Sequence, residues 1–573
     1  MENNEMNPDI IKKVTKRQVT LQREQNIVLL YCNDHENLME CLAKQDIHIN
    51  TACGGRGTCG KCKIKLLQGT LEITGADRIV FTEKQLKEGF RLACTAYPFE
   101  DITIQLAEAA EVEFEVIIAN EKEQNQKWKN EKELNKKDLT ETTGKSDQRS
   151  TEDCESIRNL GELDSGGDSR YGIGIDLGTT TLALSMVDLS NGKTIDTYTS
   201  VNHQRTYGAD VITRIQRSNQ GKQKELQECI RQDLLVGIRS LIEKTGIKVG
   251  ELEKITIAGN TTMGHLLLGY SCESLGMYPF TPINVQETIV NFREIFGSDE
   301  SQAEVVLLPG ISTFVGGDIT AGLLVCDFDK TDNINMFLDL GTNGEMAIGN
   351  RDSILVTSTA AGPAFEGGNI SCGVGSIAGA ISSVEIENER IHVKTIGDKA
   401  PIGICGTGVL ELTSELLKEK IIDDTGLLSP QFFDSGYMVV NHKELPMVFT
   451  QRDIREFQMA KAAIRAGIEI LVREYGISYD TIDTIYVAGG FGYKLNMEKA
   501  LYIGMLPKEL TGKIRTIGNS SLQGAINYLT DQQASKRAQD ILRVAEEKHL
   551  SNHEDFNDLY IAYMGFEQDG ISI

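Results

Sequence analysis

Hydrophobic residues recur at two different spacings in the first hundred residues, which is typical of a small fold that combines strands with a helix. Residues 17–31 alternate as two strands around a polar turn, and residues 36–45 carry apolar side chains at helical spacing. Further alternation predicts strands at 63–67 and 102–106. A short helix is expected at 82–88, where a threonine can cap its first turn. Together these elements predict a small mixed sheet with one main helix.

A polar stretch then interrupts this pattern. From about residue 121 to 170, glutamate, lysine, asparagine, serine and threonine dominate, and the few leucines and isoleucines are too scattered to bury a core. A flexible coil of about fifty residues would span about 40 Å root mean square. We therefore expect an N-terminal domain at 1–112, a flexible linker at 113–170 and a separate second block.

The second block begins with a strand, a Gly-Thr-Thr turn and another strand over residues 171–187, and a similar pattern returns at 337–345. Because two strand–turn–strand units of one kind imply a duplicated fold, we expect an α/β protein with a first half at 171–333 and a second half at 334–573. A third element, at 485–492, is a buried strand that runs into a glycine-rich turn.

Composition and charge narrow the possible partners and the location. The 573 residues include 83 acidic and 58 basic side chains, and the formal net charge of −25 argues against nucleic acid or an anionic membrane as the main partner. The N-terminus lacks the pattern of a secretory signal, and no apolar stretch approaches the roughly 20 residues of a membrane span. We therefore expect a cytoplasmic protein whose cysteines are reduced or bound to metal.

Four of the twelve cysteines form a pattern, namely Cys53, Cys59, Cys62 and Cys94, of which the first three share a glycine-rich stretch of ten residues. A two-iron cluster needs four thiolates around a compact inorganic core, and glycine-rich backbone can wrap that tightly. A structural zinc site is the alternative, although zinc sites usually combine two close pairs of ligands. The other cysteines are expected to be inert buried thiols: Cys32, Cys41, Cys154, Cys229, Cys272, Cys326, Cys372 and Cys405.

The order of the N-terminal elements and the cysteine spacing resemble a two-iron ferredoxin of the β-grasp type. The plant-type pattern has four residues in the first gap between cysteines, whereas this chain has five, which is more similar to the adrenodoxin-like branch. The resemblance implies that the four patterned cysteines ligate a [2Fe-2S] cluster.

An aspartate lies at the end of the strand before each of the two repeated turns. Asp176 and Asp339 can each hold Mg²⁺, usually through water, while the turns offer backbone N–H groups and hydroxyls to phosphate oxygens. The candidate phosphate-binding residues are Gly178, Thr179, Thr180, Gly341, Thr342, Asn343 and Glu345. Gly489 and Gly490 suit close backbone contact with a nucleoside.

Together, these motifs resemble the phosphate-1, phosphate-2 and adenosine motifs of the superfamily of acetate kinase, sugar kinases, heat-shock chaperones and actin. The resemblance implies a duplicated ribonuclease-H-like fold that clamps ATP and Mg²⁺ in a cleft, with linking helices that begin near residues 316 and 519. Asp318 stands at the start of the first linking helix. One interpretation is that Asp318 is a catalytic residue that positions water or a Mg²⁺ ligand. The other is that it is the N-cap of the helix, and the two interpretations are compatible.

Several further stretches are similar to a narrower family, the reductive activators of corrinoid-dependent proteins. They lie at 257–263, 360–367, 370–373, 404–408 and 518–524. The resemblance implies ATP-dependent one-electron reduction of a Co(II) corrinoid to Co(I) in a methyltransferase system. Its implied partners are a corrinoid protein and an upstream electron donor, and a homodimer is a candidate assembly.

Two features depart from the pattern of that family. Its better-known members carry a folded middle domain between the ferredoxin and the ATPase, where this chain has the polar linker. Residues 373–376 are Gly-Val-Gly-Ser where relatives usually have Gly-Met-Arg-Ala, so no role is transferred to them.

Two other functions fit the same motifs. One is a small-molecule kinase with a regulatory iron–sulfur domain, since the fold also phosphorylates sugars and acetate, and it predicts phosphate transfer to a metabolite. The other is a redox-sensing protein that binds partners according to its nucleotide state, and it predicts no electron transfer to a corrinoid.

Overall fold

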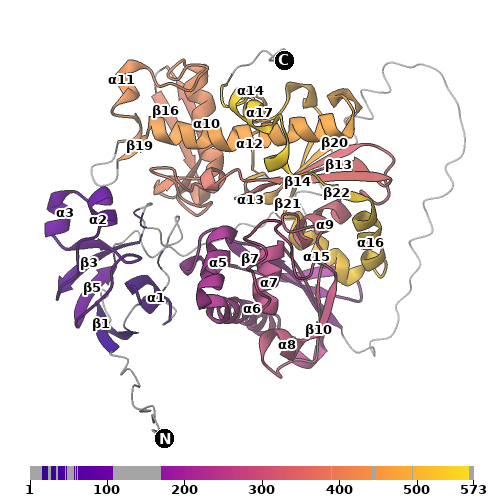
Figure 1. Ribbon diagram of the computed structural model, residues 1–573, viewed down its shortest axis with the longest axis horizontal. Coiled ribbons are helices and arrows are strands. Elements are labelled where there is room, and N and C mark those ends of the chain that lie inside the picture. The colour runs from indigo at the N-terminus through magenta and orange to yellow at the C-terminus, as the bar shows by residue number, and fades with distance from the viewer. Residues whose placement is uncertain are drawn as a thin grey trace, which may run out of the picture.

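The computed structural model describes residues 16–22, 27–33, 36–44, 47, 49, 57, 60, 62–106, 170–388, 390–441, 446–492 and 494–566. The predicted linker lies outside these residues. Figure 1 shows an N-terminal unit, coloured indigo, beside a larger body whose first half is magenta and whose second half is orange to yellow.

The N-terminal unit is a five-stranded sheet in the order β2-β1-β5-β3-β4 with three short helices. Its elements are β1 (Lys16–Gln22), β2 (Ile27–Asn33), α1 (Leu38–Ala43), β3 (Lys63–Gln68), α2 (Gly75–Val80), α3 (Glu83–Lys87), β4 (Phe90–Leu92) and β5 (Ile102–Leu106). The predicted strands and helices are confirmed, and the Thr82 hydroxyl caps α3 by accepting from the N–H of Gln85. The short elements α2 and β4 were not predicted.

One pair of cysteines in this unit corrects an expectation. Cys32 in β2 and Cys41 in α1 form a disulfide with a Cα–Cα distance of 5.3 Å. The prediction that both are inert thiols was therefore wrong. The packing of α1 against β2 brings the two sulfurs together, and no sequence pattern marks the pair.

The first half of the larger body contains a six-stranded sheet in the order β10-β11-β9-β6-β7-β8. Its strands are β6 (Tyr171–Leu177), β7 (Thr181–Asp188), β8 (Lys193–Val201), β9 (Leu252–Gly259), β10 (Thr288–Asn291) and β11 (Glu304–Leu307). Its main helices are the 3-10 helix η2 (His203–Thr206), α5 (Val211–Arg217), α6 (Gln223–Thr245), α7 (Thr261–Leu268), α8 (Phe292–Phe296) and α9 (Gly317–Val325). The first predicted strand–turn–strand unit is the antiparallel hairpin of β6 and β7.

The second half contains another six-stranded sheet, in the order β21-β20-β12-β13-β14-β22. Its strands are β12 (Asn335–Leu340), β13 (Gly344–Asn350), β14 (Ser353–Thr359), β20 (Thr484–Ala488), β21 (Ile514–Gly518) and β22 (Ala545–Glu547). Smaller sheets contain β15 (Ala380–Glu387), β16 (Arg390–Thr395) and β17 (Gly403–Ile404), and β18 (Tyr437–Val440) with β19 (Met447–Phe449). The helices include η5 (Pro363–Glu366), α10 (Gly406–Lys418), α11 (Pro430–Phe433), α12 (Gln451–Tyr475), α13 (Gly489–Gly492), α14 (Met497–Tyr502), α15 (Ser520–Thr530), α16 (Ala534–Val544) and α17 (Phe556–Ala562).

The two large sheets share one connection pattern, which confirms the predicted duplication. In the first, β6 pairs antiparallel with β7 and parallel with β9. In the second, β12 pairs antiparallel with β13 and parallel with β20. The order β8-β7-β6-β9-β11 thus corresponds to β14-β13-β12-β20-β21. Each half adds one further strand at an edge of its sheet.

Helices α9 and α15 pack against each other between the two large sheets (Figure 1). Small residues allow this close approach: a Cβ added to Gly524 would lie 2.5 Å from the Cβ of Ala321. Helix α15 of the second half also packs on β6 and β9, and α9 of the first half contacts β12. The two linking helices therefore join both halves into one continuous hydrophobic core.

Replacing Gly524 by alanine is expected to lower the free energy of unfolding by about 1–3 kcal/mol, because the added methyl has no room at the helix crossing. A denaturant titration measures this loss. Gly264 in α7 is a matched control, since an added Cβ there meets no atom within 4 Å. Gly264→Ala should leave stability unchanged or raise it by up to about 1 kcal/mol. Equal losses in both variants would contradict the packing argument.

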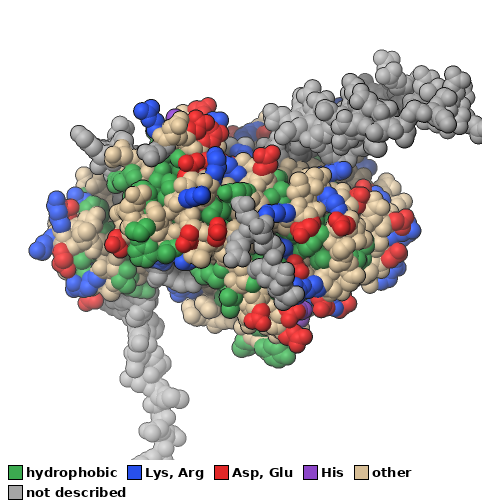
Figure 2. Space-filling view, turned by 90° about the horizontal axis from the view of Figure 1, so that it is seen from above, with side chains coloured by type: hydrophobic (Ala, Val, Ile, Leu, Met, Phe, Trp, Pro, Cys, Tyr) green, Lys and Arg blue, Asp and Glu red, His purple; other side chains and the backbone are tan. Residues whose placement is uncertain are grey.

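The surface shows no segregation of charge on the face seen in Figure 2. Lysine and arginine side chains alternate there with aspartate and glutamate, and hydrophobic side chains lie between them. Among the described residues, none of the helices combines the length and the apolar character that crossing a membrane requires.

Candidate functional site

The two predicted phosphate turns follow the central strands of the two large sheets. Asp176 lies near the end of β6, and Asp339 lies near the end of β12. Both turns are tight. A Cβ added to Gly178 would lie 2.5 Å from the Thr181 carbonyl oxygen, and the N–H of Gly341 donates to the Asn343 carbonyl at 3.0 Å.

Residues of the second half orient the carboxylate of Asp176 in the first half. Asn519 Nδ2 donates to Asp176 Oδ2 at 2.8 Å, and Ser521 Oγ donates to Asp176 Oδ1 at 2.7 Å. Asn519 is also the N-cap of α15, because its Oδ1 accepts from the N–H of Leu522. The second linking helix thus connects directly to the first candidate magnesium residue.

Asp318 lies in the first turn of α9, but it is not the N-cap. The helix begins at Gly317 and Gly316 occupies the N-cap position, so the N-cap alternative was wrong. Asp318 Oδ1 accepts from the N–H of Ile319 at 2.9 Å. The carboxylate therefore remains at the helix N-terminus, where the helix dipole favours negative charge.

Four half-buried carboxyl groups act on one another electrostatically across the two halves. Burial raises the pKa of Asp318 to about 7, and repulsion from Asp176 adds to the effect. Burial also raises the pKa of Asp339 to about 7, with repulsion from Asp318 and Asp176. The pKa of Glu345 lies well above its ordinary value because of burial and the charges of Asp318 and Asp339. Burial raises the pKa of Asp176 as well, although hydrogen bonds from α15 oppose the shift.

This carboxylate cluster, defined as Asp176, Asp318, Asp339 and Glu345, fits a cation that is held through water. In the described part of the chain, no group of three histidine, cysteine, aspartate or glutamate side chains is arranged to bind a metal directly. Mg²⁺ usually keeps several waters and binds one or two carboxylates together with substrate phosphates. The cluster therefore suits Mg²⁺ that arrives with a nucleotide.

Glu366 joins the site although it was not predicted. Thr180 Oγ1 of the first turn donates to Glu366 Oε2 at 3.2 Å, which connects the two halves. A Cβ added to Gly341 of the second turn would lie 3.9 Å from Glu366 Oε1. The residue occurs in the stretch 360–367 that resembles the corrinoid activators, but only the fold shows that it reaches both turns.

The predicted nucleoside turn packs closely on the second phosphate strand. Gly489 has a φ of +90°, and an added Cβ would lie 2.6 Å from the Leu340 carbonyl oxygen and 2.7 Å from Asp339 Oδ1. A side chain at this position would therefore collide with the end of β12. An added Cβ on Gly490 meets no atom within 4 Å, so this glycine leaves open space beside the turn.

Two of the four candidate cluster ligands lie side by side in the N-terminal unit. The Sγ atoms of Cys62 and Cys94 are 3.3 Å apart, and both side chains are buried. This separation exceeds a disulfide bond of about 2.05 Å, and both sulfurs can reach one metal at about 2.3 Å. Cys53 and Cys59 lie outside the described residues.

The glycines between these cysteines allow the loop to pack on the helix that the sequence did not predict. Gly57 has a φ of +74° and Gly60 a φ of +67°, a backbone region that glycine adopts without strain. Added Cβ atoms would lie 2.8 Å from Ala76 and 2.8 Å from Val80, both of α2. Helix α2 therefore leaves room for glycine only.

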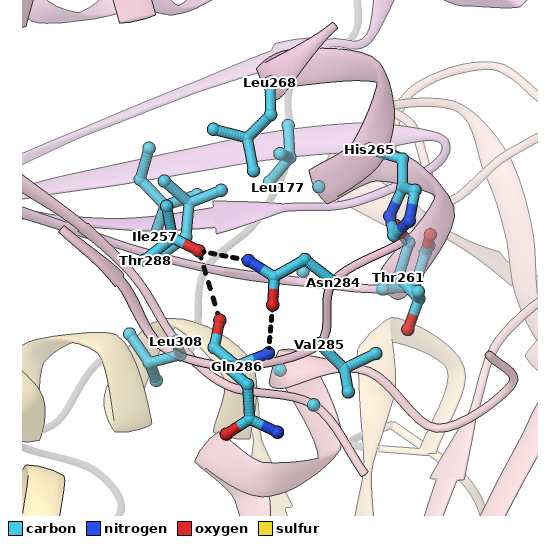
Figure 3. Close-up of a pocket in the computed structure, with 16 residues that line it drawn as sticks. Leu177, Ile257, Thr261, His265, Leu268, Asn284, Val285, Gln286, Thr288 and Leu308 are labelled. Atoms are coloured by element: carbon cyan, nitrogen blue, oxygen red, sulfur yellow. Dashed lines mark hydrogen bonds between the residues drawn. The ribbon is translucent and has the colours of Figure 1, made fainter. Parts of the chain in front are cut away.

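Figure 3 shows a pocket in the first half. Its lining includes Leu177 and Gly317, the chain neighbours of Asp176 and Asp318, but no member of the carboxylate cluster. Its polar side chains have partners within the chain. Asn284 Nδ2 donates to Thr288 Oγ1 at 3.0 Å, and His265 Nε2 accepts from the N–H of Ile283 at 3.0 Å. Burial lowers the pKa of His265, although a backbone hydrogen bond opposes the shift. We assign this pocket no ligand because the side chains of Asn284, Thr288 and His265 are already hydrogen bonded within the chain.

Family models match three consecutive parts of the chain. Residues 23–99 match a 2Fe-2S iron–sulfur cluster binding domain, and residues 171–331 match the RACo middle region. Residues 333–573 match the C-terminal domain of RACo, the ASKHA domain.

Relatives match over most of the chain. Corrinoid activation enzyme RamQ from Eubacterium limosum is 32% identical over 413 residues, which cover 68% of this chain and 69% of that protein. The chain belongs to the family of corrinoid reductive activators. A second member of this family, a reductase of the Co(II) methylated amine-specific corrinoid protein from Methanosarcina barkeri, is 27% identical over 70% of this chain and 78% of its own. The solved structure of a reductive activator for corrinoid, iron–sulfur protein has a TM-score of 0.64 and 27% identity, and covers 96% of this chain and 98% of its own.

The comparisons confirm the resemblance to corrinoid reductive activators and the ferredoxin and actin-type ATPase folds. The match to a 2Fe-2S domain supports the iron–sulfur cluster over the zinc alternative. The family's middle region is present at residues 171–331, which form the first half of the ATPase body. The polar linker precedes that region and does not replace it.

Replacing Asp339 by asparagine is expected to stabilise the protein free of nucleotide and metal at pH 8. A carboxyl group whose pKa rises on folding does not lower the free energy of unfolding at a pH below its unfolded pKa of 3.8. Above that pH it destabilises the folded protein, and the loss grows until the pH passes the folded pKa of about 7. Because the side chain is half-buried, we expect a gain of only about 1 kcal/mol at pH 8 and almost none near pH 4. Thermal unfolding in a chelator at both pH values measures it. Asp352→Asn, at an exposed turn of the same half, is the control, and an equal gain there would refute the argument.

Proposed function

We propose that this chain uses ATP to drive the one-electron reduction of a Co(II) corrinoid on a partner protein to Co(I). The observation that carries the proposal is the presence, in one chain of this family, of a paired cysteine site and a carboxylate cluster built from both halves of an ATPase fold. A site that spans two halves can convert nucleotide turnover into movement of one half against the other.

In this proposal, the carboxylate cluster holds Mg²⁺ through water, and the two turns bind the phosphates. The N–H groups and hydroxyls of Thr179, Thr180 and Thr342 would face phosphate oxygens, and Asn343 would add its amide. Gly489 and Gly490 would contact the nucleoside. Asp318 would hold the attacking water or a Mg²⁺-bound water in line with the terminal phosphate.

The four patterned cysteines would ligate the two-iron cluster. When bound, such a cluster stores and transfers one electron at a potential near −400 mV in plant-type ferredoxins. The cysteines fix its position, and the burial of Cys62 and Cys94 keeps water from two of the ligand sulfurs. An external donor must supply the electron, so the chain needs an upstream reductant as well as the corrinoid protein.

ATP is needed because the reduction of Co(II) is uphill for an ordinary cytosolic donor. For one electron, about 59 mV corresponds to about 1.4 kcal/mol. The two conformations of the ATPase body could bind the corrinoid protein with free energies that differ by about 3 kcal/mol. Such a difference would offset a gap of about 130 mV between the reduction potentials of the donor and the Co(II) corrinoid. Hydrolysis would then return the body to its starting conformation.

The direct test mixes the reduced protein, Mg-ATP and a Co(II) corrinoid protein of a methyltransferase system under anaerobic conditions. We expect the absorption band of Co(I) to rise over repeated turnovers with ATP and to stop at one round of reduction with a non-hydrolysable analogue, because hydrolysis resets the body. A parallel assay follows transfer of labelled γ-phosphate to small metabolites. Phosphate transfer without any Co(I) band would replace this proposal by the kinase function.

A further inference from the structure

A short segment separates the first phosphate turn from the N-terminal unit. We define it as the partition segment, residues 202–208, which contains η2. Its side chains alternate in burial: Asn202, Gln204 and Thr206 are buried, whereas His203, Arg205 and Tyr207 are half-exposed. The buried side chains of the segment therefore face the first phosphate turn, and its half-exposed side chains face solvent and the N-terminal unit.

The buried side of the partition segment holds the backbone of the first phosphate turn. Asn202 Nδ2 donates to the Gly178 carbonyl at 2.9 Å, and the N–H of Asn202 donates to the Thr180 carbonyl at 3.0 Å. Gln204 Oε1 accepts from Arg214 Nη1 at 3.2 Å, and Arg214 Nη2 donates to the Thr179 carbonyl at 2.5 Å. All three carbonyls of the turn are thus tied to the segment, the middle one through Arg214.

Arg214 adds positive charge directly behind this turn. Its side chain is fully buried, and its hydrogen bonds go to uncharged acceptors: the carbonyls of Gly208 and Thr179, the amide oxygen of Gln204 and the sulfur of Met263. Burial lowers the pKa of Arg214 to about 9, and the charge of Arg205 adds to the effect. A phosphate anion bound at the turn would therefore offset the buried positive charge of Arg214 and would hold its guanidinium in place.

The half-exposed side of the segment faces α1 of the N-terminal unit. Helix α1 contacts η2, and Figure 1 shows α1 on the side of the N-terminal unit that faces α5, the helix that follows η2 in the chain. The charges are complementary at one position, because α1 carries Glu40 in its first turn and η2 carries Arg205, whereas His203 Nδ1 pairs with Asp233 of α6 at 2.6 Å. Burial raises the pKa of the Tyr207 phenol, and the charges of Glu40 and Glu36 are among the smaller causes of that shift.

We propose that the partition segment is a docking surface for α1 whose affinity depends on the nucleotide: phosphate bound at the first turn fixes the segment and strengthens docking of the ferredoxin unit. The inference rests on the proposed ATP site. Thermodynamic linkage requires the reverse effect to have the same size, so docking of α1 must tighten nucleotide binding by the same factor. The electron carrier would then be held against the body while ATP is bound and released afterwards.

Hydrogen exchange of the full-length protein tests the docking, with a non-hydrolysable ATP analogue and Mg²⁺ as the probe. We expect the analogue to slow exchange about 5-fold in peptides that cover α1 and residues 203–207. Binding of a fluorescent analogue is measured in parallel. If the analogue binds without protecting α1, the inference fails while the proposed function stands. If the analogue does not bind, both fail.

Two variants separate the two faces of the partition segment. Glu40→Lys reverses the charge that α1 presents to η2, which carries Arg205, so α1 should lose its protection and the analogue should bind about 5-fold more weakly. Glu83→Lys, on exposed α3, is the matched control and should change neither. Unchanged analogue affinity in Glu40→Lys, with docking lost, would overturn the coupling.

The second variant acts on the buried face. Gln204→Leu removes the hydrogen bond from Arg214 Nη1 and the one that Gln204 Nε2 donates to the Leu226 carbonyl, at nearly equal volume. The segment then loses its link to Arg214, so protection of α1 should no longer respond to the analogue, although the analogue still binds. Gln227→Leu is the control, because Gln227 donates to the Leu267 carbonyl and lies outside the turn network. A normal response of α1 in Gln204→Leu would overturn the inference. Melting temperatures of both variants show whether each is folded.

Discussion

Replacing Asp318 by asparagine is expected to lower the rate of ATP hydrolysis about 100-fold or more, with little change in nucleotide affinity. The carboxylate stands at the N-terminus of α9 and interacts electrostatically with Asp176 and Asp339, where it can accept a proton from water or orient it. Positioned acid–base groups usually contribute about 10²- to 10⁴-fold to a rate. Steady-state kinetics with saturating Mg-ATP, together with binding of a non-hydrolysable analogue, measure the two effects separately.

The pH profile adds a second readout to the same variant. Because the pKa of Asp318 lies at about 7 before a cation binds, hydrolysis by the unmodified protein should fall as the pH drops below that region and the carboxyl becomes protonated. Asp318→Asn should weaken this dependence, and the remainder is expected from Asp339, whose pKa also lies at about 7. Asp327→Asn is the matched control, because Asp327 follows the same helix, is exposed and has a φ of +53° that asparagine tolerates. A normal rate and pH profile in Asp318→Asn would exclude a catalytic role.

Replacing Cys62 by serine is expected to abolish electron transfer to the corrinoid protein while ATP hydrolysis at saturating ATP continues. Cys62 Sγ lies 3.3 Å from Cys94 Sγ, so its loss removes one of two adjacent ligands of the cluster. The visible absorption and the electron paramagnetic resonance of the reduced cluster should disappear together with the Co(I) band. The ATPase site lies in a different unit and should retain its maximal rate.

Cys229→Ser is the matched control for this variant, because Cys229 is a half-exposed thiol of α6 in the ATPase body. It should keep both the cluster signals and electron transfer. If Cys62→Ser also eliminated ATP hydrolysis at saturating ATP, the two units would not be separable and the proposed division of labour would be wrong.

Local sequence patterns predicted those parts of the fold that short-range chemistry determines. The hairpins β6–β7 and β12–β13 were predictable because alternating apolar residues flank a turn rich in glycine and hydroxyl groups. The crossing of α9 and α15 was predictable from the small residues that each helix carries. The cysteine spacing predicted a shared metal site, and the adjacent sulfurs of Cys62 and Cys94 agree with it.

Local sequence patterns could not predict contacts between residues that lie far apart in the chain. Glu366 reaches Thr180 across 186 positions, and Arg214 reaches Thr179 across 35, so neither contact leaves a local signature. The Cys32–Cys41 disulfide was missed because the absence of a secretory signal was used to infer reduced thiols. The N-cap alternative for Asp318 was wrong by two positions, because the sequence does not mark whether Gly316 or Asp318 caps the helix.

The distribution of the carboxylate cluster along the chain bears on the lifetime of the protein in the cell. Its members come from both halves, so the repulsion of Asp339 and Glu345 by Asp318 arises only when the two halves are assembled. A ligand that binds only the closed body stabilises it by about 2.7 kcal/mol at a concentration 100 times its dissociation constant. Under the proposed function, Mg-ATP is that ligand. A fall in cellular energy charge would then expose the body to unfolding and proteolysis, so the abundance of this activator would follow the supply of the nucleotide it consumes.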